Sequence, residues 1–144
     1  MRLFKFDETI SIATQITVAD VQRLADAGFK GIICNRPDNE DYIQTNFADI
    51  AAAAEAAGIK AYYVPMPHGG LSMNDIEDFD KARKAIGEPV LAYCQSGART
   101  SSMWALHQAT TGADVKTILH TAATAGFNMG HMTGILTQLS QNAA

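Results

Sequence analysis

The sequence predicts an α/β domain in which helices flank a central, mostly parallel sheet. Two observations favour this fold class. Short apolar runs typical of buried strands recur along the first two thirds of the chain. Each later run alternates with a longer segment that has apolar residues at helical spacing, and several of these segments end at a glycine. Strands that alternate with helices pair in parallel through right-handed crossovers.

The expected elements follow from these runs and from local capping signals. The predicted strands are residues 3–6, 11–15, 30–34, 59–64 and 90–93. The predicted helices are residues 17–28, 46–57, 72–86, 100–111, 114–125 and 132–139. Two helix starts carry a capping box, Thr17 with Asp20 and Ser72 with Asp75, in which each end of the box bonds the backbone of the other.

Composition narrows the class of protein. The chain has 144 residues, 47% of them hydrophobic, and a net charge of −4, which fits a single globular domain over residues 1–144. Without a basic block, we expect no nucleic-acid partner. No apolar run approaches the length of a membrane span and the first residues lack a signal-peptide core, so we expect a cytoplasmic protein away from the membrane.

The centre of the sequence is a loop between a strand and a helix. Cys94 follows the apolar run 90–93, Gly97 provides a turn, and Arg99 stands at the start of the next helix. Backbone N–H groups in such a loop form a nest for an anion, and the helix terminus and the arginine add positive charge. A cysteine in this field loses its proton readily. We therefore expect Cys94 and Arg99 to be catalytic, rather than a structural cysteine beside a surface arginine.

The rest of the loop is expected to bind the anionic substrate. These residues are Gln95, Ser96, Gly97, Ala98 and Thr100. The hydroxyls of Ser96 and Thr100 have two candidate roles, as donors to the thiolate and as caps for the helix.

Two further loops should lie beside the cysteine, because ligand sites of parallel sheets form at the carboxyl ends of the strands. One loop contains Arg36 and Glu40, which either touch the site or pair with each other as a structural clasp. The other contains His68, a candidate general acid because histidine titrates near neutral pH. Asp75 is a second candidate acid, although the capping box already uses its carboxylate.

The second cysteine, Cys34, ends a strand at the same predicted edge. It is either a small buried hydrophobic side chain or a partner that resolves an oxidised Cys94. The four histidines lack the spacing of a metal site, so we expect neither a metal nor another cofactor.

Two motifs carry a resemblance to a known family. They are Asn35-Arg36-Pro37-Asp38-Asn39-Glu40 and Tyr93-Cys94-Gln95-Ser96-Gly97-Ala98-Arg99-Thr100-Ser101, supported by residues 15–17, 28–30, 57–58 and 64–65. From about residue 4 to residue 139 the chain resembles the bacterial beta-lactamase hydrolase-like protein, phosphatase-like domain family. The resemblance implies a fold similar to that of protein tyrosine and dual-specificity phosphatases, a Cys94 nucleophile and an Arg99 anion site. It also implies a persulfide-oxidising enzyme as a candidate partner.

The motif also departs from that of true phosphatases. Arg99 follows Cys94 by five positions instead of six, which is similar to the shorter loop of rhodanese sulfurtransferases, and Tyr93 replaces a usual histidine. A phosphatase must also protonate its leaving group, and no aspartate in the His68 loop provides a clear acid. The leading hypothesis is therefore a sulfurtransferase that takes sulfur from thiosulfate or a persulfide. The alternatives are a phosphomonoester hydrolase and a non-catalytic anion-binding or redox-sensing module.

Overall fold

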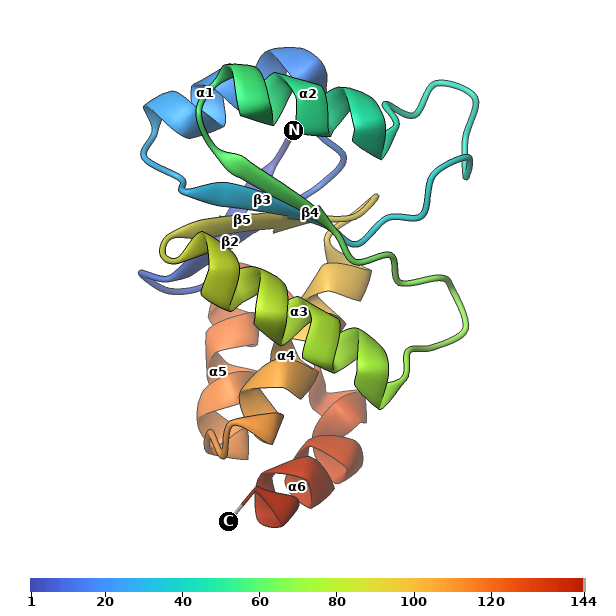
Figure 1. Ribbon diagram of the computed structural model, residues 1–144. Helices are drawn as coiled ribbons and strands as arrows, with labels where there is room; N and C mark the ends of the chain where they lie inside the picture. Colours follow the sequence, from blue (N-terminus) through green and yellow to red (C-terminus); the bar gives the residue numbers. More distant parts are fainter. Residues whose placement is uncertain (144) are drawn as a thin grey trace.

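The computed structural model describes residues 1–143 and confirms the α/β fold (Figure 1). Five strands form one sheet in the order β1-β2-β5-β3-β4. The strands are β1 (Leu3–Lys5), β2 (Ile10–Ala13), β3 (Gly31–Cys34), β4 (Lys60–Tyr63) and β5 (Val90–Tyr93). All neighbouring strands pair in parallel except β1 and β2, which are antiparallel because only a short turn joins them.

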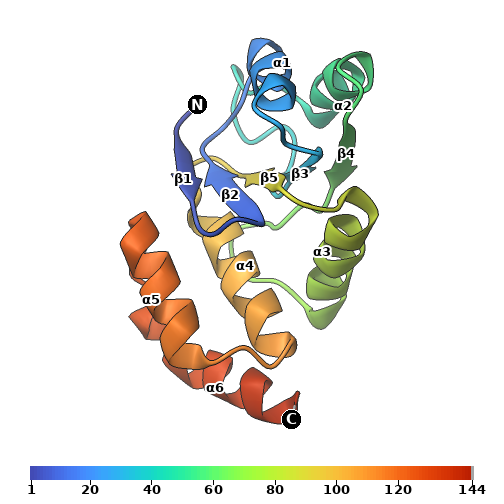
Figure 2. The same cartoon turned by 90° about the vertical axis from the view of Figure 1, so that its left-hand side faces the viewer.

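Helices cover both faces of the sheet. They are α1 (Val18–Asp26), α2 (Phe47–Ala56), α3 (Met73–Ile86), α4 (Ala98–Thr110), α5 (Val115–Ala125) and α6 (Thr133–Asn142), with a short 3-10 helix at Gly130–Met132. In Figure 2, α1 and α2 lie together on one face, and α3, α4 and α5 lie on the other. Both predicted capping boxes are present, at Thr17 and at Ser72.

The sheet is buried on both faces, as expected for parallel strands between two helix layers. Every residue of β2, β3 and β5 is buried. Alternate residues point to opposite faces, so Ile32 and Leu91 pack in the cluster beneath α1 and α2, while Ile33 and Ala92 pack in the cluster with α3 and α4.

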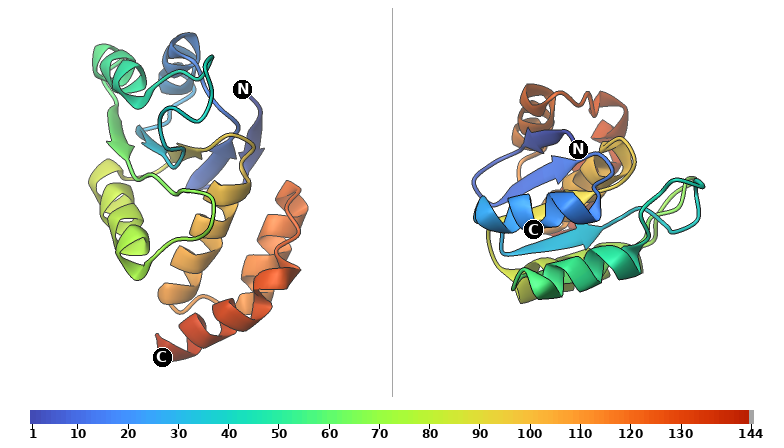
Figure 3. Two further views of the ribbon diagram at one scale, coloured as in Figure 1. Left: turned by 90° about the vertical axis from the view of Figure 1, so that its right-hand side faces the viewer. Right: turned by 90° about the horizontal axis from the view of Figure 1, so that it is seen from above.

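The strand register brings the ends of the four parallel strands to one edge. Tyr93 on β5 lies opposite Ala13 on β2 and opposite Cys34 on β3, and Cys34 lies opposite Tyr63 on β4. The loops that follow β3, β4 and β5 therefore leave the sheet on the same side, the right-hand side of Figure 1, and Figure 3 shows the first two projecting beyond the sheet.

Predicted and observed helix ends differ by up to three residues, as at α4 and at the last helix. α4 begins at Ala98, two residues earlier than expected, because Gly97 takes the cap position. The last helix runs to Asn142 instead of residue 139. Across residues 1–143, every helix is too short or too polar to cross a membrane.

Candidate active site

The loop after β5 holds the Cys94 sulfur against its own backbone. Gly97 N–H donates a 3.1 Å hydrogen bond to Cys94 Sγ, and Cys94 N–H bonds Ala13 O on the neighbouring strand. Gly97 O in turn accepts from the Ser101 hydroxyl at 2.7 Å. The loop is therefore closed by bonds at both ends, with the sulfur facing a backbone donor at the start of α4.

Glycine is required at position 97 for two reasons. Its φ of 92° lies in the left-handed region that side chains rarely adopt. A Cβ at this position would also approach Phe127 Cζ to 3.0 Å and Ile12 Cγ2 to 3.6 Å. The turn thus packs closely against Phe127 and Ile12, and a larger residue at position 97 would displace the Cys94 loop.

Arg99 is held at one end of its guanidinium. Nη1 donates to Glu40 Oε2 at 2.8 Å and to Met66 O at 3.0 Å, and Nη2 donates to Glu40 Oε1 at 2.8 Å. A guanidinium has five N–H donors, so Nε–H and one Nη2–H have no partner among residues 1–143. Those two donors form the other edge of the fork, which matches two oxygens of an anion.

Glu40 joins two arginines. Its carboxylate accepts from Arg99 and also from Arg36 Nε at 3.0 Å. The hydrogen bonds from Arg99 hold the pKa of Glu40 at about 2, and the Glu40 charge, with a smaller contribution from nearby Cys94, raises the pKa of Arg99. The two alternatives considered for Arg36 and Glu40 therefore coexist, because the pair is a clasp and the clasp reaches the Cys94 loop.

Three residues that the sequence analysis did not select complete this network. Gln15 accepts from Arg36 Nη1 at 3.0 Å, and its N–H donates to Gln95 O. Met66 provides the carbonyl that anchors Arg99. The buried Asn35 bonds Val64 O and so ties the loops after β3 and β4 together. Each follows a strand at the edge of the sheet that carries the Cys94 loop, and this position is a signal that could have identified them.

The remaining loop residues have smaller roles. Ser96 Oγ accepts a 3.4 Å bond from Ala98 N–H, so it acts as a cap rather than a donor to the sulfur. Thr100 is fully buried, and its hydroxyl has no partner among residues 1–143. The expected bond from Thr100 to the sulfur is therefore not formed.

The two candidate acids differ in their freedom. Asp75 lies in the capping box, where its carboxylate accepts from the Ser72 N–H at 2.8 Å. His68 is 72% exposed, and its Nε2 lies 3.9 Å from Glu40 Oε2. His68 therefore lies beside the Arg99–Glu40 pair, while Asp75 is committed to the start of α3.

Cys34 lies near the Cys94 loop, but its side chain packs on the face of the sheet that α1 and α2 cover. Its thiol donates to Arg36 O at 3.2 Å, within the cluster that packs under α1 and α2. Burial raises its pKa to about 11. Both cysteines are free thiols in this structure.

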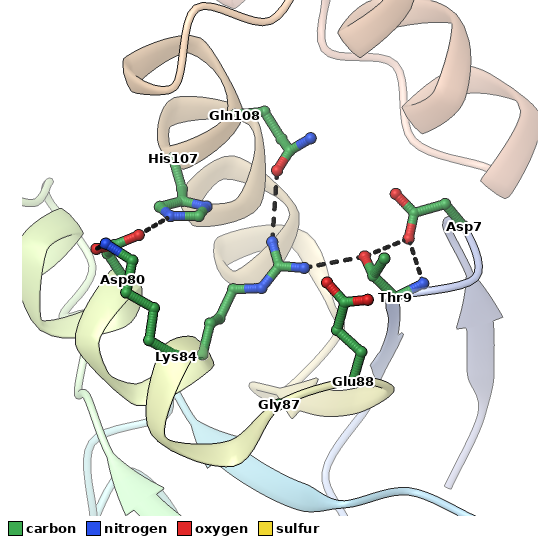
Figure 4. Close-up of a pocket in the computed structure, with 9 residues that line it drawn as sticks. Asp7, Thr9, Asp80, Lys84, Gly87, Glu88, His107 and Gln108 are labelled. Atoms are coloured by element: carbon green, nitrogen blue, oxygen red, sulfur yellow. Dashed lines mark hydrogen bonds and ion pairs between the residues drawn. The ribbon is translucent and has the colours of Figure 1, made fainter.

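A second cavity lies at the opposite edge of the sheet. It has a volume of about 640 Å³, and its lining includes Thr9 and Glu88, which precede β2 and β5. Figure 4 shows His107 of α4 bonded to Asp80 of α3 at 2.8 Å beside this cavity. Burial lowers the pKa of His107, and the hydrogen bond to Asp80 acts in the opposite direction. This cavity is separate from the Cys94 loop, because it opens at the starts of the strands.

Comparison with known proteins identifies the family of the chain. Residues 2–111 match the family model described as beta-lactamase hydrolase-like protein, phosphatase-like domain. A beta-lactamase hydrolase-like protein of Agrobacterium fabrum is 32% identical over 112 residues, which are 78% of this chain and 26% of that protein. The chain thus aligns with about a quarter of the length of this relative.

Solved structures extend the match over nearly the whole chain. A provisionally assigned phosphatase of Neisseria meningitidis is 36% identical, with a TM-score of 0.81 and coverage of 94% of this chain and 96% of that one. The structure of PTPMT1 has a TM-score of 0.75 at 15% identity, covering 99% and 96% of the two chains, and supports the fold alone.

These matches favour a phosphatase-like assignment over the rhodanese-like one that the loop length suggested. The family match covers residues 2–111, which include all five strands and the Cys94 loop. The chain belongs to the beta-lactamase hydrolase-like protein, phosphatase-like domain family.

Proposed function

We propose that this chain is a phosphomonoester hydrolase that uses Cys94 as its nucleophile. The observation that carries the proposal is the division of the Arg99 guanidinium into two edges. Glu40 and Met66 hold one edge, and Nε–H with one Nη2–H remains available for two oxygens of a phosphoryl group. The sulfur and this free edge belong to one six-residue loop, so nucleophile and anion site are positioned together.

The first step transfers the phosphoryl group to sulfur. The Cys94 thiolate attacks phosphorus, an S–P bond forms, and the ester P–O bond breaks. His68 gives its proton to the leaving oxygen, because an alkoxide is too basic to leave without one. Gly97 N–H and Arg99 offset the charge on sulfur and on the phosphoryl oxygens.

The second step releases phosphate. Water attacks the phosphocysteine, neutral His68 takes its proton, and the S–P bond breaks to return the thiolate and inorganic phosphate. His68 suits both roles because histidine exchanges protons near neutral pH, and its exposed loop position gives it freedom to reach the substrate.

A second candidate function is sulfur transfer, favoured by the size and closure of the loop. Cys94 is fully buried, and only four residues separate it from Arg99. A single sulfane sulfur needs less room than a tetrahedral phosphoryl group. In this reaction the thiolate takes the outer sulfur of thiosulfate and releases sulfite, with no general acid required.

Turnover of an aryl phosphate by wild-type protein and by Cys94→Ser tests the proposal. We expect phosphate release that the substitution abolishes. Phosphate release that persists in Cys94→Ser would overturn the proposal. So would wild-type protein that releases no phosphate at every pH tested between 5 and 8. This range brackets the titration of a histidine, whose midpoint is about 6.5.

A further inference from the structure

An apolar groove lies beside the candidate active site, between the start of α3, the middle of α4 and α6. Its volume is about 510 Å³, within the range of pockets that hold small organic ligands. Apolar side chains make up most of its lining, among them Met66, Leu71, Ile76, Leu106, Met132 and Ile135. Polar groups are few, with Ser72, Ser102 and His131 among them.

The groove adjoins Arg99 in two ways. Met66 lines the groove and also provides the carbonyl that accepts from Arg99 Nη1 at 3.0 Å. Along α4, Arg99, Ser102 and Leu106 follow one another at the helical spacing that places side chains on one face. Ser102 lies about one helical turn, roughly 5 Å, beyond Arg99. The apolar lining thus starts within about one helical turn of Arg99.

The rim of the groove leaves apolar surface open. Met73 at the start of α3 is 52% exposed, and Ile135 on α6 is 48% exposed, although both line the groove. Contiguous apolar surface of this kind marks a ligand or interaction site more often than scattered single residues do. A group that filled the groove would bury both rim residues.

We propose that the groove binds the apolar tail of the substrate, so that the substrate is an amphiphilic phosphomonoester with an alkyl or arylalkyl chain. This inference rests on the proposed function. The phosphoryl head lies at Cys94 and Arg99, and the tail runs along the α4 face past Ser102 to Leu106. Burial of the tail then adds binding energy remote from the reacting bond, in proportion to the apolar area removed from water.

Binding of alkylphosphonates, which mimic the substrate and are not hydrolysed, tests this proposal without requiring turnover. We would measure Kd by calorimetry for a series from methyl to octyl, each below its micelle concentration. Each added methylene should tighten binding roughly fourfold until the groove is full. A series with no dependence on chain length would overturn the proposal.

Substitutions at the rim locate the effect. Ile135→Glu and Met73→Glu, placed on opposite walls, should each flatten the chain-length series while methylphosphonate binds as in the wild type. Val18→Glu is the matched control, because Val18 is 47% exposed on α1 and is not part of the groove lining. If both rim variants keep the wild-type series, the tail binds elsewhere and the proposal is wrong.

The outcomes separate this inference from the function on which it rests. A steep series without hydrolysis of any phosphomonoester would leave the groove assigned and reject the hydrolase. Hydrolysis of short aryl phosphates with a flat series would reject the groove alone. A flat series together with a dimer that Ile135→Glu dissociates would make the groove a self-association surface and overturn the proposal.

Discussion

Glu40 binds Arg99 end-on, with both carboxylate oxygens 2.8 Å from the guanidinium, although the two residues are 59 positions apart in sequence. The pair leaves the other edge of Arg99 available, so we propose Glu40 as a positioning residue. Arg36 bonds Glu40 and is itself bonded by Gln15. Under this proposal the orientation of Arg99 depends on a chain of contacts that starts at Gln15, in the segment after β2.

Substitution of Glu40 should disturb this orientation. Glu40→Gln removes the charge that holds Arg36 and Arg99, so we expect kcat for an aryl phosphate to fall by roughly 10²-fold, as for other displaced catalytic groups. Glu8→Gln is the matched control, since Glu8 forms an exposed pair with Lys5. Steady-state kinetics measure both variants, and equal activity in Glu40→Gln and Glu8→Gln would contradict the positioning role.

The same ion pair should make stability depend on pH. The pKa of Glu40 is lowered from 4.5 to about 2, so its contribution to the free energy of unfolding is present above about pH 4.5 and is lost as the pH falls toward 2. We expect Glu40→Gln to be less stable than the wild type by about 2 kcal/mol at pH 7. Urea unfolding measures this difference in the free energy of unfolding, which should shrink as the pH falls toward 2. A difference that is the same at every pH would contradict the stabilising role of the Glu40 carboxylate.

His68 should matter most for substrates with a basic leaving group. His68→Asn is expected to reduce kcat for an alkyl phosphate by roughly 10²–10⁴-fold, the usual contribution of general acid catalysis. The burst of nitrophenol from a nitrophenyl phosphate reports only the first step and needs no proton on the leaving group, so it should be affected far less. Asp75→Asn serves as the control, because it weakens only the cap of α3, at a cost of about 1 kcal/mol. The reverse pattern would make Asp75 the acid.

Gly97 and Gly126 allow a matched comparison of two left-handed glycines. Both have positive φ, but a Cβ at Gly97 meets Phe127 whereas one at Gly126 meets nothing within 4 Å. Alanine should cost each about 1–2 kcal/mol of strain, and Gly97→Ala should lose roughly 1–3 kcal/mol more through overpacking. Urea unfolding and turnover would test this, with activity lost only in Gly97→Ala; equal stability losses would argue against the Phe127 contact.

Cys34 should be unreactive in the folded protein. Its pKa of about 11 keeps the thiol protonated at neutral pH, and its side chain is buried. We expect iodoacetamide at pH 7 to modify Cys34 only after unfolding, as measured by peptide mass spectrometry. Cys34→Ser should retain full hydrolysis. Rapid labelling of native Cys34 would instead support the alternative in which it resolves an oxidised Cys94.

The parts that sequence predicts well are those encoded locally. Apolar runs placed Cys94 at a strand end, Thr17 and Ser72 marked helix starts, and the order of elements implied which loops would meet. The bond between Glu40 and Arg99 could not be derived in this way, because it depends on how two loops 59 residues apart fold against each other. The apolar groove was likewise hidden, since it arises from the packing of α6 against α4.

The edge strand is the exception in a sheet predicted to be mostly parallel. β1 pairs antiparallel with β2 because a tight turn that starts at Asp7 joins them. The Asp7 carboxylate bonds the N–H groups of Thr9 and Ile10 and so fixes this turn. Loop length, rather than the periodicity of the strands, decided the direction of the pairing.

The most direct test of the account is the intermediate formed on Cys94. Wild-type protein and Cys94→Ser would be mixed in parallel with an aryl phosphate and with thiosulfate. The reactions would be quenched in acid, and the protein masses measured by intact-protein mass spectrometry. We predict phosphate release and a trapped phosphoryl adduct on wild-type protein only, with no uptake of sulfur. Gain of one sulfur atom with sulfite release, and no phosphoryl adduct, would contradict the hydrolase and identify a sulfurtransferase on a phosphatase-like fold.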